Sequence, residues 1–365
     1  MSRHSRAGGM LLRLFLGFTL AVVIGAGALY FSLSQPYQGF SNPVILDFPK
    51  GTNTSEMAAD LANSGVIRFS WQFLLARTLR SNARLQAGEY QFTQPASVWT
   101  VFDRIARGDV FFYELVVPEG ANIFDIAENV NRLGFLKGSD FIVAARNPAL
   151  IRDLAPQAPT LEGYLFPSTY RVTRNATVQQ LCRMMTDLFR KKWQALPRPA
   201  DPATVNEIVT LASLVEKETA VPEERALVAS VYSNRMRRGM ALDCDPTTIY
   251  ASLLDARYRG AIYRSDLDSA NAYNTYRHPG LPPGPIANPG LASLQAALAP
   301  ASTDFLYFVA KPDGSGGHHF STSISEHDRA VVDYRRSLQK VVQAPPPPPV
   351  APERRVRHRR SGSTP

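Results

Sequence analysis

Two carboxylates, Glu216 and Glu218, stand at the end of an otherwise apolar segment. If this segment is a helix that turns by about 100° per residue, Glu218 falls between Leu211 and Leu214 on its broad apolar face. A carboxyl group on a buried face is costly to ionise, so its pKa rises, and this suits an acid that must hold a proton near neutral pH. The alternative is a glutamate at a helix end whose side chain turns back to solvent, and the segment alone leaves both interpretations open.

The segment that carries Glu218 has the signals of a helix. Asp201, followed by a proline, is typical of the residue that caps a helix, and Pro222 ends the pattern. On this helix Glu216 lies near the edge of the apolar face, and Lys217 lies on the opposite side. Glu216 is therefore a second candidate, which would orient a loop or Lys217 through its charge.

The region around this helix, 116–340, is predicted to be mainly helical with short strands. A second helix is expected over 223–238, and a third over 291–298 precedes a strand at 305–310. A glycine-rich turn then leads to the run His318-His319-Phe320. These elements must bring the candidate residues together.

The net charge of +9 is concentrated at the two ends of the chain. The first 13 residues contribute +3 and the last 15 contribute +4, which leaves +2 for everything between them. No basic stripe with interleaved aromatic residues occurs there, so nucleic-acid binding is not expected. Residues 341–365 hold five consecutive prolines and an arginine-rich end, and we expect this tail to be disordered.

The two cysteines, Cys182 and Cys244, lie 62 positions apart and show no metal-binding spacing. No metal or cofactor is predicted. A disulfide in an oxidising compartment stays open, but two unpaired buried thiols are the preferred interpretation.

An uncharged run of 20 residues, Leu14 to Leu33, is long enough to cross a membrane. Arginines precede it and no positive residue follows until Lys50, so the positive-inside rule places residues 1–13 in the cytoplasm and the rest outside. A cleaved signal peptide is the competing interpretation. The length of the apolar run favours a retained single-span anchor at 14–33.

A repeat with a period of 69 residues relates 48–67 to 117–136. Proline, glycine and asparagine recur at 49/118, 51/120 and 53/122. Each copy is predicted to be a strand, a turn and an amphipathic helix that ends at glycine. The pattern resembles the LysM glycan-binding module, with a generic αβ repeat as the alternative, and it defines a small α+β domain over 43–115.

Four motifs in this order are similar to those of a known family. They are Glu162-Gly-Tyr-Leu-Phe-Pro167, Val215-Glu-Lys-Glu-Thr219, Asp245-Pro-Thr-Thr-Ile-Tyr250 and Tyr273-Asn-Thr-Tyr276. Over roughly 14–340 the chain resembles the endolytic murein transglycosylases of the YceG-like (MltG) family, which are single-span inner-membrane proteins with a LysM-like region before the catalytic part. One departure is Ser168, where the family usually has an aspartate.

The resemblance implies cleavage of MurNAc–GlcNAc bonds within nascent peptidoglycan strands, by a periplasmic catalytic domain near the membrane. Glu218 would protonate the leaving glycosidic oxygen and then act as the base on the 6-hydroxyl of the same MurNAc. A 1,6-anhydro sugar forms without water, so the usual second catalytic carboxylate is not needed. Strand elongation would end there, and peptidoglycan synthases are candidate partners.

Several further residues are candidates for binding the glycan, each with a structural alternative. Asn274 and Tyr276 suit N-acetyl groups and sugar hydroxyls, or stabilise their own loop. Tyr164 stacks on a sugar ring or belongs to the core. Asp245 is a second carboxylate near Glu218 or a helix N-cap. His319 hydrogen-bonds glycan or is structural.

The sequence therefore predicts an α+β protein: a transmembrane helix, a small LysM-like domain and a larger, mainly helical catalytic domain. Two other functions remain open. A muramidase would use water and a second catalytic carboxylate. An anchored peptidoglycan-binding scaffold would have no activity.

Overall fold

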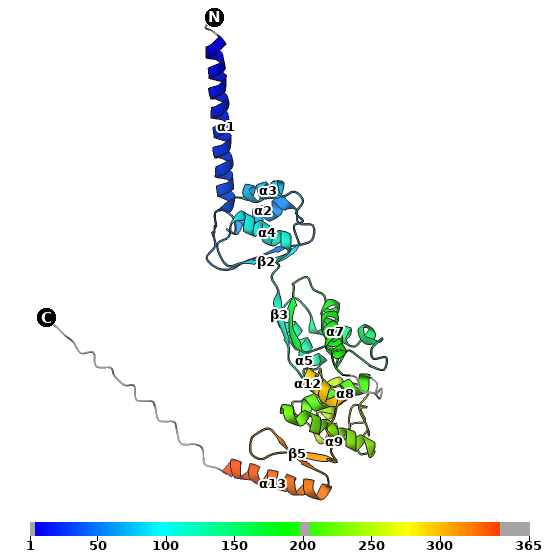
Figure 1. Cartoon of the computed structure of the whole chain (residues 1–365). Helices are drawn as coiled ribbons and strands as arrows, with labels where there is room; N and C mark the ends of the chain where they lie inside the picture. Colours follow the sequence, from blue (N-terminus) through cyan, green and yellow to red (C-terminus); the bar gives the residue numbers. More distant parts are fainter. Residues whose placement is uncertain (1–3, 198–204, 344–365) are drawn as a thin grey trace, which may run out of the picture. The chain divides into compact units, whose positions relative to one another are not determined.

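The computed structural model describes residues 4–197 and 205–343, and helices and short strands alternate along this chain (Figure 1). Its described residues divide into two compact units: the first is 4–197 with 205–209 and 283–290, and the second is 210–282 with 291–343. The predicted mixture of helix and sheet is confirmed. The predicted helix cap at Asp201 and most of the predicted disordered tail lie outside the described residues.

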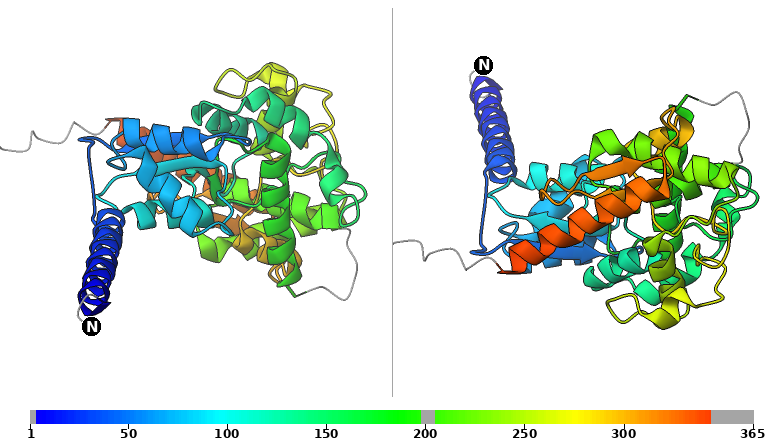
Figure 2. Two further views of the ribbon diagram at one scale, coloured as in Figure 1. Left: turned by 90° about the horizontal axis from the view of Figure 1, so that it is seen from above. Right: turned by 90° about the horizontal axis from the view of Figure 1, so that it is seen from below.

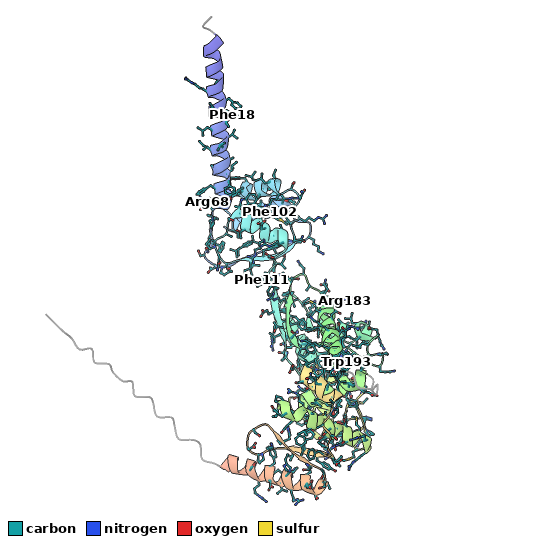
Figure 3. All side chains as sticks on the ribbon, in the orientation of Figure 1. Phe18, Arg68, Phe102, Phe111, Arg183 and Trp193 are labelled. Atoms are coloured by element: carbon teal, nitrogen blue, oxygen red, sulfur yellow. The ribbon has the colours of Figure 1, made fainter. Side chains whose placement is uncertain are left out.

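The chain begins with the long helix α1 (His4–Ser34). Within it, Arg13–Ser34 is the one stretch of the described residues that is long and apolar enough to cross a membrane. From residue 13 to residue 31 its side chains are exposed, and Phe18 projects away from the helix axis (Figure 3). The end of α1 is anchored to the first unit, because Leu33 is buried and Gln72 Nε2 donates to the carbonyl of Ser32 at 3.1 Å.

The repeat appears in the first unit as two βααβ arrangements. The first comprises β1 (Val44–Phe48), α2 (Thr54–Asn63), α3 (Ser70–Leu79) and β2 (Gly88–Phe92). The second comprises β3 (Tyr113–Val117), α5 (Ile123–Arg132), α6 (Gly138–Ala145) and β4 (Ser168–Val172). In each copy the outer strands pair antiparallel, Phe48 opposite Gly88 and Val117 opposite Ser168.

An asparagine at the equivalent position caps the first helix of each copy. The side chain of Asn53 accepts from the Glu56 backbone N–H at 2.9 Å, and that of Asn122 accepts from the Asp125 N–H at 3.0 Å. In each case the acidic side chain three residues on bonds back to the asparagine N–H, which is the capping-box arrangement.

Two further helices belong to the first unit. The helix α4 (Val98–Arg107) follows β2 and ends at Gly108, whose φ of 73° few other residues adopt easily. It contributes Val101, Phe102 and Ile105 to the core between the helices and the β1–β2 pair. The helix α7 (Val178–Gln194) follows β4 and buries Phe189.

The second unit is mainly helical, with one antiparallel hairpin. Its helices are α8 (Val205–Glu218), which starts in the first unit, α9 (Arg225–Arg237), α10 (Asp245–Leu254), α11 (Arg264–Leu267), α12 (Leu291–Leu298) and α13 (Ile324–Gln343). The hairpin comprises β5 (Tyr307–Ala310) and β6 (His318–Ser321), and α13 runs along it (Figure 2). The predicted bounds of α12 are confirmed, whereas α13 was not predicted.

Candidate active site

A cavity of about 370 Å³ in the second unit surrounds the end of α8. Its lining side chains come from α8, α9, α10, β5, α13 and the loops between them: Glu218, Tyr232, Arg235, Leu242, Asp243, Asp245, Tyr276, Tyr307, Phe308, Ile324 and His327. Most of them carry a polar or charged group, so the cavity suits a polar ligand.

The helix α8 places Glu218 at this cavity through its apolar face. Leu211, Leu214 and Val215 are buried, and Glu218 is the last helical residue on the same side. The helix ends there because the Thr219 hydroxyl accepts the backbone N–H of Val221 at 3.0 Å. Glu218 remains partly exposed because one side of its carboxyl group faces the cavity.

One carboxyl oxygen of Glu218 receives two hydrogen bonds. Tyr232 Oη donates to Oε1 at 2.8 Å, and Cys244 Sγ donates to the same atom at 3.1 Å. Both donors are buried, on α9 and at the start of α10 respectively. No side chain in the described ranges 4–197 and 205–343 hydrogen-bonds Oε2. A proton held by this group therefore belongs on Oε2.

The surroundings favour the protonated form of Glu218. Burial raises the pKa of its carboxyl, and the charge of Asp245 acts in the same direction. The hydrogen bonds from Cys244 and Tyr232 and the charge of His318 lower this pKa. The net shift of the Glu218 pKa is upward. Burial also raises the pKa of Tyr232 and of Cys244, so both keep the protons that they donate. The group can thus act as an acid near neutral pH.

A second carboxylate, Asp245, also lines the cavity. It is the first residue of α10, and Tyr276 Oη donates to its Oδ1 at 2.7 Å. Burial raises the pKa of Tyr276, and the hydrogen bond to Asp245 adds to this effect. The predicted alternative of a helix N-cap is wrong, because the capping position belongs to Cys244 and the Asp245 side chain points to the phenol.

The model of the YceG-like family matches residues 46–333, which is most of the chain. This chain belongs to the YceG-like family. The cavity and its three acidic residues, Glu218, Asp243 and Asp245, lie within the matched region.

Two curated relatives are named endolytic murein transglycosylases. The one from Bacillus subtilis is 29% identical over 334 residues, which cover 86% of this chain and 91% of that protein. The one from Streptococcus pneumoniae strain D39 is 28% identical over 324 residues, which cover 80% of this chain and 59% of that protein.

A solved relative gives the same assignment to the family. A crystal structure of a yceG-like protein from Listeria monocytogenes matches 80% of this chain and 99% of its own, with 28% identity and a TM-score of 0.51.

Two of the predicted glycan-binding residues are structural in this member of the family. Asn274 is fully buried, and its amide donates to the carbonyls of Asp266, Leu267 and Ser269 at 3.3, 2.9 and 2.8 Å. It holds its own loop and presents no surface to a ligand. Tyr164 is fully buried in the first unit, so the prediction that it stacks on a sugar ring is also wrong.

The phenol of Tyr164 serves the core of the first unit instead. It donates to Asn206 Oδ1 at 3.1 Å, and its ring meets that of Phe189 edge-on at 5.1 Å. Glu216, the second acidic candidate, is not among the residues that line the cavity. Ser168, at the departure from the family pattern, begins β4.

His319 is not among the residues that line the cavity, whereas the charge of its neighbour His318 acts on Glu218. Successive strand residues point to opposite faces, and His319 is exposed on the face of β6 away from Phe308. His318 lies on the other face, where its ring meets that of Phe308 at 5.4 Å. The buried Glu224 accepts from the His318 backbone N–H at 2.8 Å and lies 2.7 Å from its Nδ1. Alternation along β6 separates the two histidines.

The two donors to Glu218 were not predicted from the sequence either. Cys244 is buried and unpaired, as preferred from the sequence, yet it belongs to the site. Tyr232 follows Glu218 by 14 residues, and its only signal is a place on the buried face of the next helix. Among the described residues, no three or more His, Cys, Asp or Glu side chains are grouped to hold a metal ion.

Proposed function

We propose that this protein is a membrane-anchored lytic transglycosylase that cleaves MurNAc–GlcNAc bonds within nascent peptidoglycan strands and leaves 1,6-anhydro ends. Membership of the YceG-like family and the names of the relatives support the activity and the substrate class. The observation that carries the mechanism is the arrangement of Glu218, a residue that lines an open cavity and has both of its hydrogen-bond donors on one carboxyl oxygen.

Glu218 acts first as the acid and then as the base. Its Oε2 gives a proton to the glycosidic oxygen as the bond from that oxygen to C1 of MurNAc breaks. The carboxylate then takes the proton of the MurNAc 6-hydroxyl, whose oxygen attacks C1 and closes the anhydro ring. The acid is regenerated and no water is consumed, so one carboxyl group is sufficient.

The groups around Glu218 have separate roles in this proposal. Tyr232 and Cys244 fix Oε1, so that the transferable proton stays on the oxygen that faces the substrate. Tyr276 and Asp245 form a hydrogen-bonded pair on the wall of the cavity and are placed to contact sugar hydroxyl and N-acetyl groups.

The remaining predictions extend this proposal to the whole chain. Residues 14–33 span the inner membrane with the N-terminus in the cytoplasm, and the catalytic part at 116–340 acts in the periplasm. The module at 43–115 and the second repeat at 117–136 are LysM-like and hold the glycan strand. Peptidoglycan synthases are the proposed partners, because they supply the nascent strands.

A second candidate function is favoured by Asp245. Glu218 and Asp245 line the same cavity, and a pair of carboxyl groups is also what a muramidase uses to hydrolyse this bond. In that reaction Asp245 would activate water or form a covalent intermediate, and the products would carry reducing ends.

Mass spectrometry of the products made from uncrosslinked, newly polymerised glycan separates these functions. We expect anhydro ends from the wild type and from Asp245→Asn, and a large loss of cleavage in Glu218→Gln. Reducing ends that disappear in Asp245→Asn would establish the muramidase. Glycan binding without cleavage by the wild type would identify a scaffold.

A further inference from the structure

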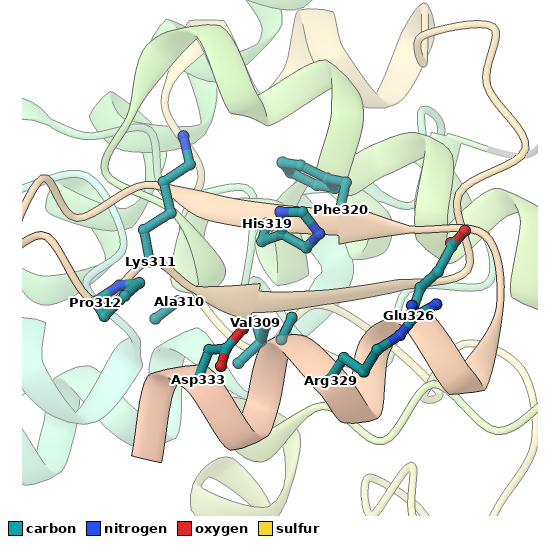
Figure 4. A pocket seen from close by; sticks show the side chains of 10 residues that line it. Val309, Ala310, Lys311, Pro312, His319, Phe320, Glu326, Arg329 and Asp333 are labelled. Atoms are coloured by element: carbon teal, nitrogen blue, oxygen red, sulfur yellow. The ribbon is translucent and has the colours of Figure 1, made fainter. Parts of the chain in front are cut away.

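A second hollow lies next to the catalytic cavity, between the β5–β6 hairpin and α13. We call this hollow the α13 groove; its volume is about 670 Å³ (Figure 4). Its lining residues are Val309, Ala310, Lys311, Pro312, His319, Phe320, Glu326, Arg329, Ala330 and Asp333. No function proposed above uses these residues.

The α13 groove continues from the catalytic cavity along one helix. Ile324 and His327, in the first turns of α13, line the cavity, while Arg329 and Asp333 line the groove. From His327 to Asp333 a helix advances about 9 Å, which an extended peptide of about three residues spans. A chain that leaves the cavity in this direction therefore lies in the groove.

The charges of the α13 groove favour a ligand with negative groups. Its acids are engaged, because Glu326 accepts from the Thr322 backbone and hydroxyl at 3.1 Å each and Asp333 pairs with Arg336 at 3.2 Å. The exposed cations Lys311 and Arg329 form no ion pair within the described part of the chain.

The hydrogen bonds from Thr322 also lower the pKa of Glu326, which keeps this acid ionised and in place. Glu326 and Asp333 are thus committed to the protein, whereas the charges of Lys311 and Arg329 are available to carboxylate groups.

We propose that the α13 groove binds the peptide stem of the glycan strand, with Lys311 and Arg329 holding its carboxylates. This inference rests on the proposed function. The stem is joined to the lactyl group of MurNAc, the sugar whose C1 reacts, so it must leave the cavity beside the cleavage point. The neutral sugars themselves have no negative group for these cations, and the groove has the size of a pocket for a small ligand.

The enzyme therefore binds the peptide as well as the sugar, and it prefers glycan strands that carry peptide stems. The test compares kcat/KM for an uncrosslinked polymer with that for the same polymer after an amidase has removed the stems. Both polymers keep any lipid pyrophosphate at the strand end, so the comparison isolates the peptide from this other anion.

The double variant Lys311→Ala/Arg329→Ala should bring the ratio of the two kcat/KM values toward one, by about two- to thirtyfold, as expected for two solvent-exposed ion pairs. Arg335→Ala removes a charge from the exposed side of the same helix, outside the α13 groove, and is the matched control. A ratio that stays at the wild-type value in the double variant, or that falls equally in Arg335→Ala, would overturn the proposal.

A binding measurement separates failure of this inference from failure of the proposed function. Isothermal titration of a soluble muramyl tetrapeptide into the full-length Glu218→Gln protein needs no cleavage. If the wild type cut neither polymer, the catalytic proposal would fail, while loss of tetrapeptide binding on adding Lys311→Ala and Arg329→Ala would still support the groove. Unchanged binding would exclude it.

Discussion

Two glutamates with different surroundings, Glu162 in the first unit and Glu218 in the second, show what makes a carboxyl group reactive. Glu162 is fully buried, its Oε2 accepts the Ile123 backbone N–H at 2.9 Å, and its Oε1 accepts the Asn288 amide at 2.8 Å. Glu218 receives both of its donors on Oε1, and its carboxyl group lines a cavity. Glu162 joins a helix start to a distant loop, whereas Glu218 retains an oxygen that can transfer a proton.

Replacing Glu218 by glutamine gives the largest expected effect. Glutamine keeps an oxygen for the hydroxyl and thiol donors but has no proton to transfer, so cleavage of glycan should fall by about 10²- to 10⁴-fold. The rate of anhydro-product formation measures this. Glu223→Gln, an exposed neighbour, is the control and should retain activity. If Glu218→Gln cleaved glycan at the wild-type rate, Glu218 would not be the acid of the reaction.

The same substitution at Glu162 should affect stability and leave the chemistry in place. Glutamine offers only one oxygen, so one of the two donors is left without an acceptor, or faces an amide N–H, at a cost of about 1–3 kcal/mol. Thermal unfolding followed by circular dichroism measures the loss. Glu114→Gln, on an exposed position of β3, should stay within about 0.5 kcal/mol of the wild type. An equal loss in both variants would show that the buried bonds are not the cause.

The two donors to Glu218 should set the pH range of activity. Their hydrogen bonds lower its pKa, so Tyr232→Phe or Cys244→Ala should raise that pKa further. The acid form then survives to higher pH, and the alkaline limb of the kcat/KM profile moves upward. Tyr307→Phe removes a cavity phenol that does not bond Glu218, and should leave this limb in place. A shift to lower pH in the donor variants would contradict the assignment.

The smallest effect is expected at Tyr164. Removing its hydroxyl in Tyr164→Phe breaks the bond to Asn206 and should cost about 1 kcal/mol of stability. Activity per folded molecule should not change, because the ring is buried in the core. If Tyr164→Phe raised KM without a loss of stability, the result would support the predicted contact between Tyr164 and a sugar ring.

Much of the local structure could be predicted from the sequence. The apolar face of α8, the span of α12 and the glycine that ends α4 depend on residues within a few positions of each other. The helix α13 was missed because its sequence is dominated by polar residues and its contacts are with the distant hairpin.

The site was predictable only in part. Glu218 was chosen correctly as a residue on the buried side of α8, and its place at a cavity fits that choice. The partners of Asn274 and of Tyr164 depend on how loops and helices pack, so their polar groups gave no sign of being buried. His319 and His318 differ only in the face of β6 on which they lie.

The sequence by itself determined the apolar first helix, the two asparagine-capped repeats and the acidic end of α8, because each follows from interactions between near neighbours in the chain. Only the tertiary structure decided that Tyr232 and Cys244 share one oxygen of Glu218 and that Asp245 faces the same cavity. Those contacts require three helices to pack at one point, and a hydrogen bond forms only when packing brings donor and acceptor within about 3 Å of each other.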